Sequence, residues 1–230
     1  MSGIRENIER VKERIESVCR RVDRDPNEIT LVCVTKTIDI ARINEAIGWG
    51  ITDIGENRIQ ESKTKFGKLS RPVKWHMVGH LQTNKAKDAV RMFDLIHSID
   101  SLKIAEAIDR RAGQLGRQVD CLIEVNTSGE ASKFGVMPDE VFGLVEEMAK
   151  LNNLRIKGLM TMAPLVDDPE LARPYFRELK SLSEQVESRN FSNVQMQYLS
   201  MGMTQDFEVA VEEGSNMVRI GTAIFGPRGG

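Results

Sequence analysis

Lys36 is the residue whose type and position most directly suggest chemistry. It follows the apolar run at 31–34 and lies between Thr35 and Thr37. If that run is a buried strand, neighbouring strands surround the stem of Lys36 and partly desolvate its amine. Desolvation lowers the pKa of a lysine and favours Schiff-base formation with an aldehyde. A lysine that only reaches solvent, or one that pairs with Glu56, explains this position equally well.

Two short segments near the end of the chain are rich in glycine and hydroxyl groups. Ser200 and Gly202 follow one apolar run, and Gly221 and Thr222 follow the last one. Glycine lets a ligand approach the backbone closely, and a hydroxyl donates a hydrogen bond, so the two segments suit a phosphate group. The alternative is that Gly221 only forms a turn.

Arg219 lies within the last apolar run, one residue before Ile220. A buried arginine needs a partner, because an unpaired charge in the interior is costly. Glu124 or Glu56 could pair with it for structural reasons. A ring nitrogen of a bound ligand is the functional alternative.

The histidines and cysteines do not predict a metal site. His76 and His80 are four residues apart but not on one helix, and no acidic residue pairs convincingly with them or with His97. Of the three, only His80 is expected at the rim of a pocket. The cysteines are odd in number and far apart, as reduced cytosolic thiols commonly are: Cys19, Cys33 and Cys121.

The elements that must position these residues alternate along the chain. Eight short apolar runs begin about every 27 residues, and helical patterns separate them, which predicts parallel strands with crossover helices. Eight strands favour a closed (β/α)8 TIM barrel over an open sheet. We expect one domain over 1–230, with a leading amphipathic helix at 1–24 and the barrel at 30–226. The strands are expected at 30–34, 51–54, 74–78, 95–99, 119–125, 156–160, 194–199 and 217–220, and further helices at 40–48, 57–66, 84–92, 101–115, 138–151, 169–187 and 204–213.

Composition excludes several classes of protein. The net charge is −2, so the chain lacks the basic surplus of a nucleic-acid binder. No run is long and apolar enough for a membrane span, and the charged N-terminal segment does not resemble a signal peptide. We therefore expect a cytoplasmic protein that binds neither nucleic acid nor membrane. A TIM barrel carries its site at the carboxyl ends of the strands, where Lys36, Ser200 and Gly221 stand.

The chain resembles the pyridoxal phosphate homeostasis protein family over almost its whole length. The motifs that carry the resemblance are LVCVTKT, DIGENRIQE, WHMVGHLQTNK, CLIEVNTSGEASKFG, IKGLMTMAP and YLSMGMTQDFEVAVEEGSNMVRIGTAIFGPR. The resemblance implies a barrel like the N-terminal domain of alanine racemase, with pyridoxal 5′-phosphate (PLP) as cofactor. It also implies a role in vitamin B6 homeostasis without catalytic turnover.

The resemblance assigns roles to individual residues of this chain. Lys36 matches the lysine that carries PLP, and Arg219 matches the arginine that faces the pyridine nitrogen. The phosphate cradle corresponds to Ser200, Gly221 and Thr222, and the side chains beside the ring correspond to Asn57 and Met201. Thr204 stands where the family often has serine, and either residue is expected to cap the following helix.

A PLP-dependent racemase of narrow or vestigial activity is the alternative function. Racemisation needs a second base on the opposite face of the ring, which in the racemases is a tyrosine from a second domain of a partner subunit. Here Tyr175 falls on a crossover helix and Tyr198 within a strand, and the sequence ends soon after the last strand. We therefore expect a non-catalytic monomer that passes PLP to apo-enzymes. A regulator that contacts a partner through the helix at 84–92 is a third, less supported reading.

Overall fold

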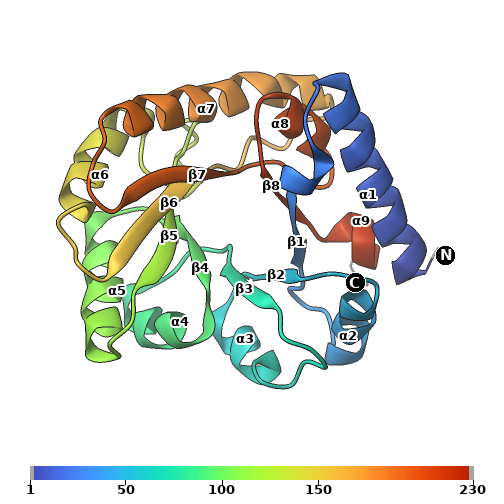
Figure 1. Ribbon diagram of the computed structural model, residues 1–230, viewed down its shortest axis with the longest axis horizontal. Coiled ribbons are helices and arrows are strands. Elements are labelled where there is room, and N and C mark those ends of the chain that lie inside the picture. The colour runs from blue at the N-terminus through green and yellow to red at the C-terminus, as the bar shows by residue number, and fades with distance from the viewer. Residues whose placement is uncertain (1–2, 228–230) are drawn as a thin grey trace.

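The structure, a computed structural model, describes residues 3–227. Eight strands form a closed barrel in the order β1 to β8, and each pairs in parallel with its neighbours. Helices surround the barrel (Figure 1). The predicted TIM barrel with a leading helix is therefore confirmed. In chain order the elements are α1 (Ile4–Arg21), β1 (Thr30–Val34), α2 (Ile40–Gly48), β2 (Asp53–Glu56), α3 (Ile59–Lys65), β3 (Lys74–Met77), α4 (Ala86–Met92), β4 (Leu95–Ile99), α5 (Leu102–Gln114), β5 (Val119–Glu124), α6 (Val141–Met148), β6 (Leu154–Met160), α7 (Arg173–Ser188), β7 (Val194–Ser200), α8 (Phe207–Glu212), β8 (Met217–Ile220) and α9 (Thr222–Phe225).

Some helix starts differ from the sequence prediction. Helix α8 begins at Phe207 rather than at Thr204, so Thr204 does not cap it. The Thr204 hydroxyl instead accepts a hydrogen bond of 3.4 Å from the backbone N–H of Ala223, at the start of α9. Ser101 precedes α5 as predicted, but its hydroxyl donates to Asp100 and makes no cap hydrogen bond. Helix α9 was not predicted, because four residues are too short for a periodic pattern.

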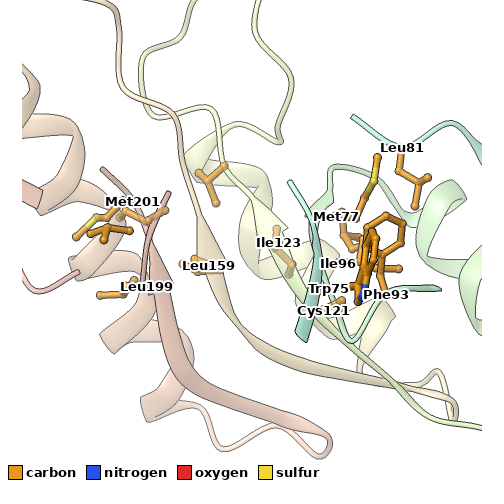
Figure 2. Packing of buried hydrophobic residues seen from close by; sticks show 14 of the residues in the cluster. Trp75, Met77, Leu81, Phe93, Ile96, Cys121, Ile123, Leu159, Leu199 and Met201 are labelled. Atoms are coloured by element: carbon orange, nitrogen blue, oxygen red, sulfur yellow. The ribbon is translucent and has the colours of Figure 1, made fainter. Parts of the chain in front are cut away.

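Two apolar layers hold the barrel together. Alternate strand residues point outward and pack under the helices, among them Trp75, Met77 and Leu199 (Figure 2). A smaller apolar cluster joins Val32, Val78, Leu95, Leu122, Met160 and Met217. Buried polar side chains share the barrel interior with this cluster, among them His76, Ser200 and Arg219, and the candidate site is built from these.

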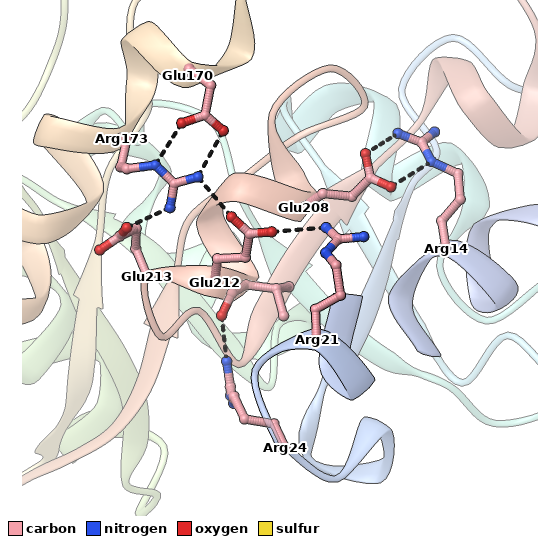
Figure 3. Close-up of polar contacts among 9 residues, drawn as sticks. Arg14, Arg21, Arg24, Glu170, Arg173, Glu208, Glu212 and Glu213 are labelled. Carbon is pink, nitrogen blue, oxygen red and sulfur yellow. Dashed lines mark hydrogen bonds and ion pairs between the residues drawn. The ribbon is translucent and has the colours of Figure 1, made fainter. Parts of the chain in front are cut away.

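Ion pairs connect helix α1 to helix α8, near the end of the chain (Figure 3). Its apolar stripe is buried, and Arg14 donates two hydrogen bonds to Glu208 on α8, at 2.9 and 3.2 Å. Arg21 pairs with Glu212 on the same helix at 2.8 Å. Arg173 also contacts Glu212, at 2.7 Å. The leading helix therefore braces α8, which directly follows the loop after β7.

Between residues 3 and 227, no helix has the length and the apolar character needed to cross a bilayer. The three cysteines are free, in agreement with the predicted reduced thiols, and all three are buried.

Candidate functional site

A pocket of about 390 Å³ opens at the carboxyl ends of β1, β6, β7 and β8. Lys36, Arg219, Gly221 and Thr222 all line it. An adjoining pocket of about 160 Å³ shares Lys36, Gly221 and Thr222 with the first. The structure thus brings four of the seven predicted site residues together around two connected hollows, in the size range of small-molecule sites.

The turn that carries Lys36 is held from below by a buried ion pair. Lys65 on α3 is only 4% exposed, and its Nζ donates to Glu56 Oε1 at 2.7 Å and to the Thr35 carbonyl at 2.8 Å. The Thr35 hydroxyl donates to the same Glu56 oxygen at 2.6 Å. Thr37 then adopts a positive φ of 66°, and its backbone N–H donates to Glu61 Oε1 on α3. Backbone before and after Lys36 is therefore fixed by side chains from β2 and α3.

The same contacts show which residues the Glu56 carboxylate pairs with. The sequence left open whether this carboxylate pairs with Lys36 or with Arg219, but the bonds of Glu56 go to Lys65 and Thr35. Burial raises the pKa of Glu56 in spite of the ammonium beside it. Glu56 is thus a structural residue that holds the turn, and its second oxygen is buried without a hydrogen-bond partner.

Arg219 lies at the base of the pocket and is 4% exposed. Its Nη1 donates to the Ser200 carbonyl at 2.7 Å and to the Ser200 hydroxyl at 2.6 Å, and its Nη2 donates to the Thr161 carbonyl at 2.8 Å. No carboxylate among residues 3–227 bonds it, so of the two alternatives for Arg219, the pair with Glu124 or Glu56 is not formed. Burial lowers the pKa of Arg219 to about 10. The Nε–H and one Nη2–H remain for a ligand.

Glu124, at the end of β5, interacts with Arg219 only through its charge. Burial and the charge of Asp100 raise the pKa of Glu124 to about 7, although Arg219 acts in the opposite direction. Its Oε2 is buried without a hydrogen-bond partner. A carboxyl group near half-ionisation at neutral pH therefore lies close to the pocket base.

Ser200 is buried and connects Arg219 to two histidines. His97 Nδ1 lies 3.0 Å from the Ser200 hydroxyl, and His97 Nε2 lies 2.9 Å from His76 Nδ1. His76 Nε2 in turn lies 2.9 Å from Asp53 Oδ1. Sequence reasoning missed this chain and found no acidic partner for these histidines. A polar residue at an inward position of two successive strands was the signal that could have revealed it.

Asn57, Ser200 and Met201 do not line the pocket. The Asn57 Oδ1 is buried without a hydrogen-bond partner. The Met201 side chain is fully buried in the layer under the helices. The structure therefore does not bring these three side chains to the pocket surface with Lys36.

The loops after β6 and β7 supply lining residues that sequence reasoning did not assign to the site. Thr204, predicted only as a helix cap, is one of them, and the others are Ala163, Pro164, Leu165, Val166, Pro169, Met203, Gln205 and Asp206. Asp206 accepts a hydrogen bond of 2.6 Å from the backbone N–H of Met203 and so shapes the loop. Gly202 has a φ of 91°, and a Cβ there would lie 2.6 Å from the Ala210 Cβ, so only glycine fits this close passage.

His80 does not lie at the rim of this pocket, as the sequence had suggested. Its Nδ1 pairs with Asp100 at 3.1 Å and its ring stacks on Phe134, with 3.9 Å between the ring centroids. It lines a separate hollow before α5. Among residues 3–227, no cluster of histidine, cysteine and acidic side chains could hold a metal ion.

The sequence of this chain is similar to those of known proteins. The alanine racemase N-terminal domain family matches residues 4–229. The pyridoxal phosphate homeostasis protein of Aquifex aeolicus is 43% identical over 224 residues, which is 97% of each chain. That of Vibrio alginolyticus is 40% identical and covers 99% of each chain.

Two solved structures extend the comparison. PipY of Synechococcus elongatus with PLP bound has a TM-score of 0.83 at 33% identity, covering 94% of this chain and 100% of that chain. An alanine racemase of Clostridium difficile has a TM-score of 0.77 at 14% identity, covering 100% of this chain and 58% of that one. At that identity the likeness to the racemase concerns the fold alone.

Proposed function

Because the chain belongs to the pyridoxal phosphate homeostasis protein family, we propose that it binds PLP in the pocket around Lys36 and acts in PLP homeostasis without catalytic turnover. The resemblance drawn from the sequence motifs is confirmed over the full chain. The observation that carries the proposal is the convergence of Lys36, Arg219, Gly221 and Thr222 on one pocket. An amine, a buried guanidinium and a glycine-rich turn are the groups that an aldehyde, a pyridine ring and a phosphate require.

The residues of the pocket fit PLP. The two remaining N–H groups of Arg219 suit a neutral ring nitrogen, which accepts a hydrogen bond. Gly221 lines the pocket with backbone alone, so a phosphate can approach its N–H, and its α-carbon packs closely on β1, where a Cβ would lie 3.2 Å from the Val34 carbonyl oxygen. The exposed Thr222 follows Gly221 and lines the same pocket.

We propose that Lys36 carries PLP covalently. Its Nζ would attack the aldehyde carbon, the C=N bond of a Schiff base would form, and the aldehyde oxygen would leave as water. The reverse hydrolysis returns the amine and free PLP, so the attachment suits a carrier that gives up its load. Recipients would be apo-enzymes that use PLP, and a single chain suffices for the pocket as described.

The surroundings of the ring support binding over turnover. Arg219 only donates hydrogen bonds, so it favours an unprotonated ring nitrogen and a weak electron sink. Neither Tyr175 nor Tyr198 lines the pocket, although a racemase needs a second base there. Glu124, with its pKa of about 7, is the one observation in favour of the racemase alternative, since a carboxyl group of that pKa can exchange protons at neutral pH.

Replacing Lys36 with alanine is the direct test. We expect the purified wild-type protein, incubated with PLP, to show the yellow absorption band of the Schiff base. In Lys36→Ala this band should be absent, because Lys36 is the one lysine among the described residues that line the pocket. Lys87→Ala, which removes an exposed lysine on α4, should retain the whole band and serves as the control.

A variant Lys36→Ala that keeps the full band would refute covalent attachment to Lys36. The racemase alternative needs a separate measurement, in which wild-type protein is incubated with each amino acid in deuterated water. Exchange of the Cα proton at enzymatic rates would replace the carrier function by catalysis, and absence of exchange supports it.

A further inference from the structure

An unbroken chain of hydrogen bonds runs through the barrel interior from β2 to the pocket base. It joins Asp53, His76, His97, Ser200 and Arg219, with separations of 2.9, 2.9, 3.0 and 2.6 Å. Five strands contribute to it, and each of its members is less than 10% exposed. Buried polar groups of this kind must be mutually satisfied, so the position of every proton is constrained by its neighbours.

Both ends of the chain have fixed roles. Arg219 can only donate, so the Ser200 hydroxyl oxygen accepts from it. Burial opposes ionisation of Asp53, but hydrogen bonds from His76 and Thr52 outweigh it and hold the pKa of Asp53 below its usual value, so this end is a carboxylate that only accepts.

The intervening protons follow by elimination. His76 donates to Asp53 from Nε2, which leaves its Nδ1 as an acceptor when the ring is neutral. His97 must then donate to His76 from Nε2. Burial, reinforced by the charge of Arg219, holds the pKa of His97 well below its usual value, so this ring is neutral and its Nδ1 accepts. The only donor available to that nitrogen is the Ser200 hydroxyl.

We propose that this chain positions Arg219 for its ligand. Each donor points towards Asp53, so the Ser200 proton goes to His97 and the lone pairs of the Ser200 oxygen are left for the guanidinium. Polarisation along such a chain strengthens each bond and lets the negative charge of Asp53 support a guanidinium that has no carboxylate in contact. His76 and His97 are thus positioning residues, which act on the ligand through Arg219.

The inference rests on the proposed function, because its ligand is PLP. It also gives Ser200 a different role from the one that the family resemblance implies. A hydroxyl whose proton is held by His97 does not donate to a phosphate. The phosphate cradle would then depend on Gly221 and Thr222, and Ser200 would serve the opposite end of the ligand, where Arg219 meets the ring.

Nitrogen NMR of the PLP-free protein tests the direction of the chain without any ligand. With 15N-labelled histidine at about pH 8, His76 and His97 should both appear as the Nε2–H tautomer. Observation of the Nδ1–H tautomer at His97 would overturn the proposal. Asp53→Asn should release the tautomer of His76, because an amide can donate or accept, and the His97 signals should shift with it.

The consequence for the ligand is measured on the same variant. We expect Asp53→Asn to weaken PLP binding roughly tenfold, the effect of losing a charge-assisted hydrogen bond, and to shift the absorption maximum of bound PLP. His80→Gln, outside the chain, should change affinity by less than about twofold. Unchanged affinity and spectrum in Asp53→Asn would refute the positioning role while leaving PLP binding at Lys36 intact. Loss of the proposed function would instead show in Lys36→Ala and leave both tautomers as they are.

Discussion

Lys65→Met is expected to lower the free energy of unfolding by about 3–5 kcal/mol, because it removes one member of a buried ion pair and leaves the other unpaired. Glu56 is fully buried and would lose the ammonium group 2.7 Å away. Glu61 would lose the same partner at 2.6 Å, and the Thr35 carbonyl would lose its donor. Methionine has a similar length, so packing alone does not explain a loss of this size. Urea denaturation followed by circular dichroism measures it.

Lys63→Met is the matched control for this prediction. Lys63 lies on the same helix and pairs with Asp88 at 2.7 Å, but its side chain is 52% exposed. Exposed pairs contribute less than about 1 kcal/mol, so the control should unfold almost as the wild type does. If the two variants lost the same free energy of unfolding, the buried Glu56–Lys65 pair would contribute no more to stability than the exposed pair does.

Lys65→Met is also expected to affect the candidate site. Lys65 holds the carbonyl of Thr35, the residue before Lys36. We therefore expect Lys65→Met to weaken the binding of PLP even at temperatures where the variant remains folded. Lys63→Met leaves that carbonyl bonded and should bind PLP as the wild type does.

The barrel could be predicted because its signals are local and repeated. Each strand is an apolar run and each helix an amphipathic stretch, so eight alternations suffice to identify a (β/α)8 barrel. The strands at 30–34, 95–99 and 217–220 coincide with the predicted ranges. The start of α8 was misplaced by three residues, since Thr204 is a good cap by type but here bonds α9 across the pocket.

The site was predictable only in part, for a physical reason. Lys36, Gly221 and Thr222 follow strand ends, and the barrel brings all strand ends to one rim. The partners of Arg219 depend instead on which side chains meet inside the barrel, and this is a matter of register between strands far apart in the sequence. Ser200 and His97 are 103 residues apart, and nothing local in either segment indicates that they touch.

Glu124→Gln is expected to stabilise the protein at pH 8 by about 3 kcal/mol and to have little effect at pH 4. The pKa of Glu124 is raised from 4.5 to about 7 in the folded protein, and each unit corresponds to about 1.4 kcal/mol. The glutamine has the same shape and carries no charge, so it is free of the cost of ionising a carboxyl group at a buried position. Unfolding midpoints measured in urea across this pH range give the difference directly.

The sign of the effect follows from proton linkage. Below the unfolded pKa of 4.5, both states keep the proton and the two proteins should be equally stable. Between 4.5 and about 7 the unfolded chain loses the proton first, so wild-type stability falls as pH rises, and above about 7 the deficit is constant. Glu106→Gln, at an exposed position on α5, should show no such trend. A stability gain in Glu124→Gln that is the same at pH 5 and pH 8 would show that the glutamine acts through packing rather than through the raised pKa of Glu124.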